Sequence, residues 1–297
     1  MNINATLAAS LDRQETPSPS DWETTFRQMM LFDLAADMEL GFFLSYYRNF
    51  AIPSIAKTLH TNAEIQQRAM KRSYDTAIVI YELIACGLDS DRGRPMVELL
   101  NRVHRNVPGS KDDFLYVLLT LLVVPIRWIQ QHAWRQPTKA ELVAASRFFT
   151  ELGTRMNITC VPATYEEAEA FFDNYETTHV AASPEGRHLM DATVQVFQDR
   201  LPAPLRPVAK QMISTMLDDD RLTHALGLPR AGRISRTALT TGLKLRNAIT
   251  RRRPLKTKPH FTPGDAGSSL YPDGYSLNQI GPVNVPHSPA HAGNELP

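Results

Sequence analysis

The chain has 297 residues, of which 43% are hydrophobic and 21% are charged, a composition typical of a globular protein. Lys and Arg total 32 against 31 Asp and Glu, so there is no basic excess of the kind that duplex-binding proteins carry, and we expect no nucleic-acid partner. Two cysteines, Cys86 and Cys160, are too few for a disulfide framework. They fit a reducing compartment, and the expected location is the cytoplasm.

The two ends of the chain differ in character from its middle. Residues 1–20 are polar, lack the apolar run of a signal peptide, and are expected to be disordered. Residues 254–297 are rich in Pro and Gly and predict an irregular tail, of which the aromatic residues Tyr271 and Tyr275 suit a place on the domain surface. The most apolar stretch, 114–129, is shorter than the ~20 residues that a bilayer span requires. It is therefore expected to be a core helix, while peripheral membrane contact remains an open alternative.

Residues 21–253 predict a single all-α domain. Capping boxes, in which Ser or Thr precedes Glu by three residues, mark helix starts. Four of them begin at Ser20, Thr61, Thr138 and Thr164. These starts and the 3.6-residue hydrophobic period predict helices over 21–48 (with a break allowed), 62–86, 95–106, 111–132, 139–156, 165–178, 184–200, 204–217 and 235–252. No alternating pattern indicates a strand.

Helix 62–86 places two polar residues on its apolar stripe. Arg72 and Thr76 fall in the middle of a stripe that is otherwise made of Ile65, Ala69, Ile80 and Leu83. A guanidinium that faces a core must find a carboxylate, a water network or a ligand. Two interpretations are open: a structural ion pair, or a residue of a ligand site.

His104 lies on the apolar side of helix 95–106, beside Val97 and Leu100. Such a histidine is commonly structural, but a neutral imidazole on a rigid helix is also a suitable axial ligand for haem iron. No Cys-x-x-Cys-His motif is present, so any haem would be held without covalent attachment.

Two Glu-x-x-His sequences, Glu176 to His179 and Glu185 to His188, match the motif of di-iron helix bundles. The first ends one predicted helix and the second begins the next. Metal-bridging pairs face each other from the middles of two helices, so this placement argues against a di-iron centre.

The order of these residues resembles that of a known family. Arg72-Ser-Tyr-Asp-Thr76 followed by His104 is similar to the Arg-x-x-x-Thr…His arrangement of the MpaB-like oxygenases, which include the latex-clearing rubber oxygenases. The similarity extends from about residue 52 to residue 253, through segments 113–118, 125–128, 152–156 and 162–167. At Asp75 the chain departs from the rubber-cleaving branch, which has a lysine before the threonine.

The resemblance implies an all-α, globin-reminiscent fold that holds one b-type haem. It makes His104 the proximal iron ligand, here expected to bind through Nε2, and places Arg72 and Thr76 on the polar side of the haem as site residues. Characterised members of the family use O₂ to cleave double bonds in polyisoprenoid or prenylated substrates.

We therefore predict a haem-dependent oxygenase that acts on a hydrophobic, unsaturated, isoprenoid-like substrate. The expected walls of its pocket are helix 114–129 together with Phe148, Phe149 and Met156, residues that would serve equally well as core. Two alternatives stay open: a non-catalytic carrier of a lipid-like molecule, and a non-haem di-iron oxidase.

Overall fold

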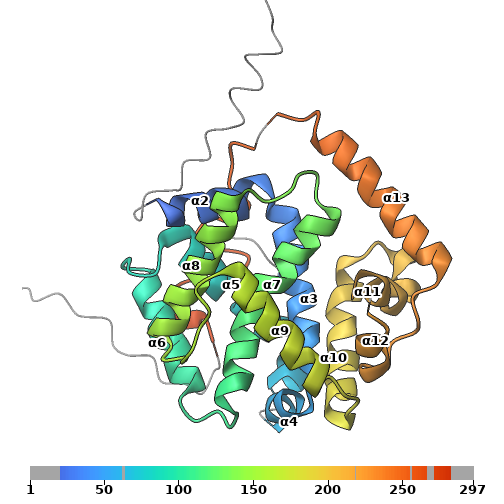
Figure 1. Cartoon of the computed structure of the whole chain (residues 1–297), viewed down its shortest axis with the longest axis horizontal. Coiled ribbons are helices and arrows are strands. Elements are labelled where there is room, and N and C mark those ends of the chain that lie inside the picture. The colour runs from blue at the N-terminus through green and yellow to red at the C-terminus, as the bar shows by residue number, and fades with distance from the viewer. Residues whose placement is uncertain (1–20, 62–63, 218, 255, 266–270, 282–297) are drawn as a thin grey trace, which may run out of the picture.

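A computed structural model describes residues 21–61, 64–217, 219–254, 256–265 and 271–281. In these residues every regular element is a helix and no strand occurs, which confirms the predicted fold class (Figure 1). The predicted N-terminal disorder over 1–20 lies outside the described residues, as does the end of the tail after residue 281. No helix among the described residues combines the length and the apolar character that crossing a bilayer demands.

The elements follow one another in chain order. They are α2 (Trp22–Gln28), the π-helical turn η1 (Met29–Asp33), α3 (Ala35–Phe50), α4 (Pro53–Thr61), α5 (Glu64–Cys86), α6 (Gly93–His104), α7 (Lys111–His132), α8 (Lys139–Arg155), α9 (Tyr165–His179), α10 (Pro184–Arg200), the 3-10 turn η2 (Ala203–Val208), α11 (Ala209–Leu217), α12 (Asp220–Ala225), α13 (Arg233–Thr250) and the 3-10 turn η3 (Leu277–Gln279).

Side-chain caps fix the starts of the middle helices. Thr138 caps α8 and Thr164 caps α9, each in the reciprocal pattern with Glu that the sequence predicted. Ser110 forms a further capping box at the start of α7, with Asp113 in the place of Glu. The predicted box at Ser20 lies outside the described residues, and Thr61 ends α4 instead, with its Oγ1 donating to the carbonyl of Lys57 at 2.8 Å.

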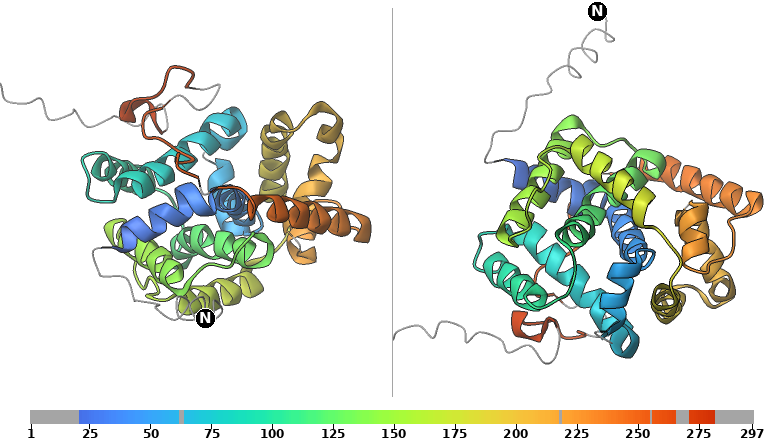
Figure 2. Two further views of the ribbon diagram at one scale, coloured as in Figure 1. Left: turned by 90° about the horizontal axis from the view of Figure 1, so that it is seen from above. Right: turned by 60° about the horizontal axis from the view of Figure 1, so that its bottom comes forward.

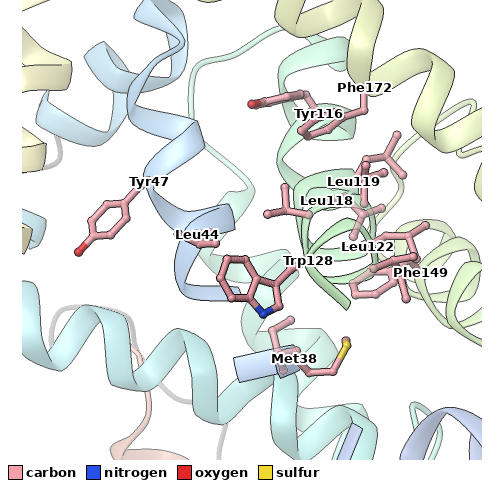
Figure 3. Packing of buried hydrophobic residues seen from close by; sticks show 14 of the residues in the cluster. Met38, Leu44, Tyr47, Tyr116, Leu118, Leu119, Leu122, Trp128, Phe149 and Phe172 are labelled. Carbon is pink, nitrogen blue, oxygen red and sulfur yellow. The ribbon is translucent and has the colours of Figure 1, made fainter. Parts of the chain in front are cut away.

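The core is built around α7, which is flanked by α3 on one side and by α8 and α9 on the other (Figure 3). The backbones of α3 and α7 touch at Gly41, where an added Cβ would lie 2.3 Å from Cα of Pro125. Ser45 seals the same crossing, since its Oγ donates to the carbonyls of Gly41 and Thr120. Only a glycine permits this approach, so α3 and α7 pack in close contact, and both helices contribute side chains to the cavity described below.

Two C-terminal segments lie outside this core. Helix α13 runs along the edge of the molecule, next to α11, and has no buried residue (Figures 1 and 2). The tail then returns to the body, where the backbone N–H of His260 donates to the carbonyl of Leu31 at 2.7 Å. Residues 271–281, which include η3, continue against α5, so this described part of the tail packs on the domain.

Candidate functional site

A cavity of about 970 Å³ lies between the helices and the returning tail. This volume is at the upper end of the ~300–1,000 Å³ range of ligand pockets. Its wall is mainly apolar and aromatic. The principal lining residues are Phe42, Phe43, Tyr46 and Tyr47 from α3, Ile55 and Leu59 from α4, Ala77, Ile78, Ile80 and Tyr81 from α5, Phe114, Val117 and Leu121 from α7, Val196 from α10, and Pro259, Phe261, Tyr271 and Tyr275 from the tail. Such a wall suits a large hydrophobic ligand.

His104 is the last residue of α6 and lines this cavity. Its Nδ1 lies 2.7 Å from the carbonyl oxygen of Leu100, one turn earlier, and the ring meets that of Phe114 edge-on at 6.1 Å between centroids. A carbonyl can only accept, so Nδ1 carries the proton of the neutral ring and Nε2 keeps its lone pair. Burial lowers the pKa of His104 below its usual value and the positive charge of Arg72 adds to this effect, against the opposing bond to Leu100. The imidazole is therefore neutral at pH 7 and able to bind a metal.

Arg72 and Thr76 both line the cavity, one turn apart on α5. The guanidinium donates to the hydroxyl of Thr76, which in turn donates to the backbone carbonyl of Arg72 at 2.8 Å. Within the described residues no carboxylate forms an ion pair with Arg72, so the structural ion pair considered from the sequence is not found there. The structure thus brings all three sequence-predicted site residues, Arg72, Thr76 and His104, to one cavity.

Two buried carboxylates of α5 hold the tail against the cavity. Tyr271 donates to Asp75 at 2.7 Å, and the backbone N–H of Gly281 donates to the same carboxylate at 3.0 Å. Lys71 forms an ion pair with Asp75. Asp75, at the position where the resemblance led us to expect a lysine in the rubber-cleaving branch, is 3% exposed and holds the tail.

Glu82 holds the tail two turns further along α5. It is fully buried, accepts a hydrogen bond from Tyr275 at 2.6 Å, and is paired with Arg92. Burial opposes the ionisation of Glu82, but the hydrogen bonds from Arg92 and Tyr275 outweigh it and hold the pKa of Glu82 below its usual value. The contact is thus a charged one, formed by an ionised carboxylate inside the protein.

The sequence placed the aromatic residues of the tail on the domain surface but did not predict that the tail lines a cavity. His260 lines the cavity, and its Nε2 lies 3.2 Å from Glu39 Oε2. Phe261 stacks on Tyr81, with 5.3 Å between the ring centroids. Aromatic residues kept within a segment of otherwise loop-like composition were the available signal for this packing.

The predicted pocket wall is correct for α7 and wrong for α8. Phe114, Val117 and Leu121 line the cavity, but Phe148, Phe149 and Met156 do not. Phe148 and Phe149 are buried against Phe26 of α2, at 4.9 and 6.1 Å between ring centroids. The two helices have similar apolar faces, and which of them borders a cavity depends on helix packing.

The first carboxylate of the di-iron alternative, Glu176, is already bound to other side chains. Both oxygens of Glu176 accept from Arg48 at 2.7 Å, and one also accepts from the buried Tyr116 at 2.9 Å. Its partner in the motif, His179, is exposed, as is His188 of the second motif. Glu176 therefore serves as a structural ion-pair partner between α3, α7 and α9.

Comparison with known proteins agrees with this arrangement. Residues 32–248 match the family described as "ER-bound oxygenase mpaB/B'/Rubber oxygenase, catalytic domain". The chain belongs to this family. The match includes Arg72, Thr76 and His104, and it ends before the tail residues that line the cavity.

Individual relatives from this oxygenase family are distant. The chain is 24% identical to ER-bound oxygenase mpaB' of Penicillium brevicompactum, over 80% of this chain and 71% of that protein. It is 26% identical to ER-bound oxygenase mpaB of Penicillium roqueforti (strain FM164), over 61% of this chain and 66% of that one. A solved structure of latex clearing protein LCP in the closed state superposes with a TM-score of 0.63, at 17% identity, over 87% of this chain and 76% of the other. The last likeness is one of fold.

Proposed function

We propose that the protein is a b-type haem-dependent oxygenase that uses O₂ on a hydrophobic, unsaturated, isoprenoid-like substrate. The observation that carries the proposal is the state of His104: a neutral imidazole with Nδ1 bound to a backbone carbonyl and Nε2 available, on the wall of a large apolar cavity. Membership of an oxygenase family supports the reaction class.

The residues of the cavity fit a haem. A haem would require a side chain that binds its iron, an apolar space for its macrocycle and polar groups for its carboxylates. His104, aromatic rings from three helices, and Arg72 on the wall would supply these. When bound, haem would supply O₂ activation, which no side chain can perform.

The side chains would position and protect the reacting groups. The carbonyl of Leu100 holds the His104 ring in one tautomer, and a hydrogen bond of this kind increases the basicity of a ligating imidazole. Thr76 orients the guanidinium of Arg72, which can donate to anionic groups. The apolar wall would hold the substrate and exclude water from the site.

Visible absorption of the purified protein, together with an iron assay, tests the proposal. A Soret band with stoichiometric iron is expected. Iron without a Soret band would indicate a non-haem site, and a colourless, metal-free protein that binds an apolar ligand would indicate a carrier. Squalene, a short isoprenoid hydrocarbon used as a probe, should then stimulate O₂ uptake by the haem-containing protein.

A pair of histidine variants tests the ligand. The His104→Ala protein should fold and lose its haem. The His260→Ala protein, which lacks the other histidine on the described cavity wall, should keep its haem. Retention of full haem occupancy and an unchanged spectrum in His104→Ala would show that another residue binds the iron.

A further inference from the structure

Helix α13 carries a stripe of exposed apolar side chains along its whole length. Ile234, Leu245 and Ile249 are 87%, 64% and 45% exposed, and they account for half of the large hydrophobic residues that the described chain exposes in this way. With Ala238 and Thr241 they are spaced by four, three, four and four residues, so they form one face of the helix. A soluble helix normally turns such a face to the core.

Other faces of α13 are fastened to the body, and these contacts leave the stripe directed outward. Arg246 pairs with Asp37 at 2.7 Å, and Asn247 donates to the carbonyl of His132 at 2.8 Å. Near the other end, Gln211 of α11 donates to the hydroxyl of Ser235 at 3.4 Å. The folded protein therefore holds α13 at the edge of the molecule with its apolar stripe facing outward (Figure 2).

The segment of chain that carries the stripe is strongly basic, although Asp220 and Asp37 pair with Arg236 and Arg246 of α13. Residues 221–264 contain 11 Lys and Arg and no Asp or Glu, although the whole chain has a net charge of only +1. At helical spacing, Arg233 and Lys244 border the stripe and Arg252 continues it beyond the last turn; all three are exposed. A second copy of this face would bring two cationic surfaces together, which opposes self-association through it.

We infer that α13 is a docking surface for an anionic lipid bilayer. The helix lies in the plane of the interface, Ile234, Leu245 and Ile249 enter the acyl boundary, and the flanking cations contact lipid phosphates. Amphipathic helices with this division of apolar and basic faces bind in the same way. The inference goes beyond the proposed activity and does not depend on whether haem is bound.

Vesicle flotation with the full chain tests the inference. Vesicles of phosphatidylcholine with an equal amount of phosphatidylserine should bind the protein, and vesicles of phosphatidylcholine alone should bind it much more weakly. Added salt should weaken the binding, because it screens the attraction of exposed charges. Equal binding to both vesicles, or no binding to either, would overturn the inference.

Substitutions on two helices locate the surface. Ile234→Gln and Leu245→Gln should each weaken binding about tenfold, since each removes a large apolar side chain from the buried contact. Val143→Gln, which removes a residue of 44% exposure on α8, is the matched control and should bind like the original chain. Equal binding by all four proteins would overturn the assignment to α13. So would light scattering that shows a dimer of the original chain, abolished by Leu245→Gln, because the stripe would then be covered by a second copy.

Discussion

The C-terminal tail should loosen when the hydroxyl of Tyr275 is removed. In Tyr275→Phe the ring remains and only the 2.6 Å hydrogen bond to Glu82 is lost. The carboxylate is not left alone, because Arg92 still donates to it from Nε at 2.9 Å and from Nη2 at 2.5 Å. The substitution therefore measures the contact between the tail and α5, separately from the cost of stranding a buried charge.

The size of the effect follows from the type of bond. A hydrogen bond to a charged group contributes about 1.5–3 kcal/mol. The lower end applies here, because Glu82 keeps Arg92 as a partner. The loss should act on local opening of the tail, whose described residues form no regular element except the short turn η3, rather than on global unfolding. Since about 1.4 kcal/mol corresponds to a factor of ten, tail amides should exchange with solvent about tenfold faster.

Hydrogen exchange followed by mass spectrometry is the appropriate assay. The reporters are the amides of His260 and Tyr275, which donate to the carbonyls of Leu31 and Gly264 at 2.7 and 3.3 Å. Tyr165→Phe is the control, because it removes a hydroxyl that bonds Glu169 and should leave tail exchange unchanged. Unaltered tail exchange in Tyr275→Phe would refute the conclusion that the buried carboxylate holds the tail.

Three other expectations concern pH, packing and the cavity wall. The neighbours of Glu82 hold its pKa below the usual 4.5, so its stabilisation of the tail should be complete above pH 4.5 and lost as the pH falls through the lowered pKa. Hydrogen exchange of the tail, corrected for intrinsic rates, should therefore become faster only in acid. Gly41→Ala should cost about 1–3 kcal/mol in urea unfolding because its Cβ would meet Pro125, whereas Gly242→Ala, with no neighbour within 4 Å, should be neutral or stabilising. Phe261→Ala should weaken the binding of an apolar fluorescent probe, and an unchanged affinity would show that the tail is no part of the binding wall.

The parts of the fold that the sequence predicted well are those determined by local interactions. The starts of α8 and α9 depend on a hydroxyl and a carboxylate three residues apart, and both are as predicted. Helix α4 was missed because it is only nine residues long and because Thr61, its last residue, carries the pattern of a cap for the next helix. A capping pattern fixes a helix start only if the chain before it is not already helical.

The parts that could not be predicted depend on contacts between distant residues. The sequence places Arg72, Thr76 and His104 near one another because they lie on consecutive helices, and all three do line one cavity. The bonds from Tyr271 to Asp75 and from Tyr275 to Glu82 join residues 196 and 193 positions apart, and no local pattern announces them. Tyr271 and Tyr275 are therefore missing from the predicted site because their partners lie far away in the sequence.

The position of the tail contacts has a consequence for ligand selection. The family match ends at residue 248, yet Phe261 and Tyr275 form part of the cavity wall and Asp75 holds the segment between residues 271 and 281 in place. The matched residues thus supply His104 and most of the apolar wall, and the tail supplies the rest of it. For a ligand too large for the cavity, the free energy of displacing the tail would add to the cost of binding. Relatives with the same site residues and a different tail should therefore accept substrates of different length.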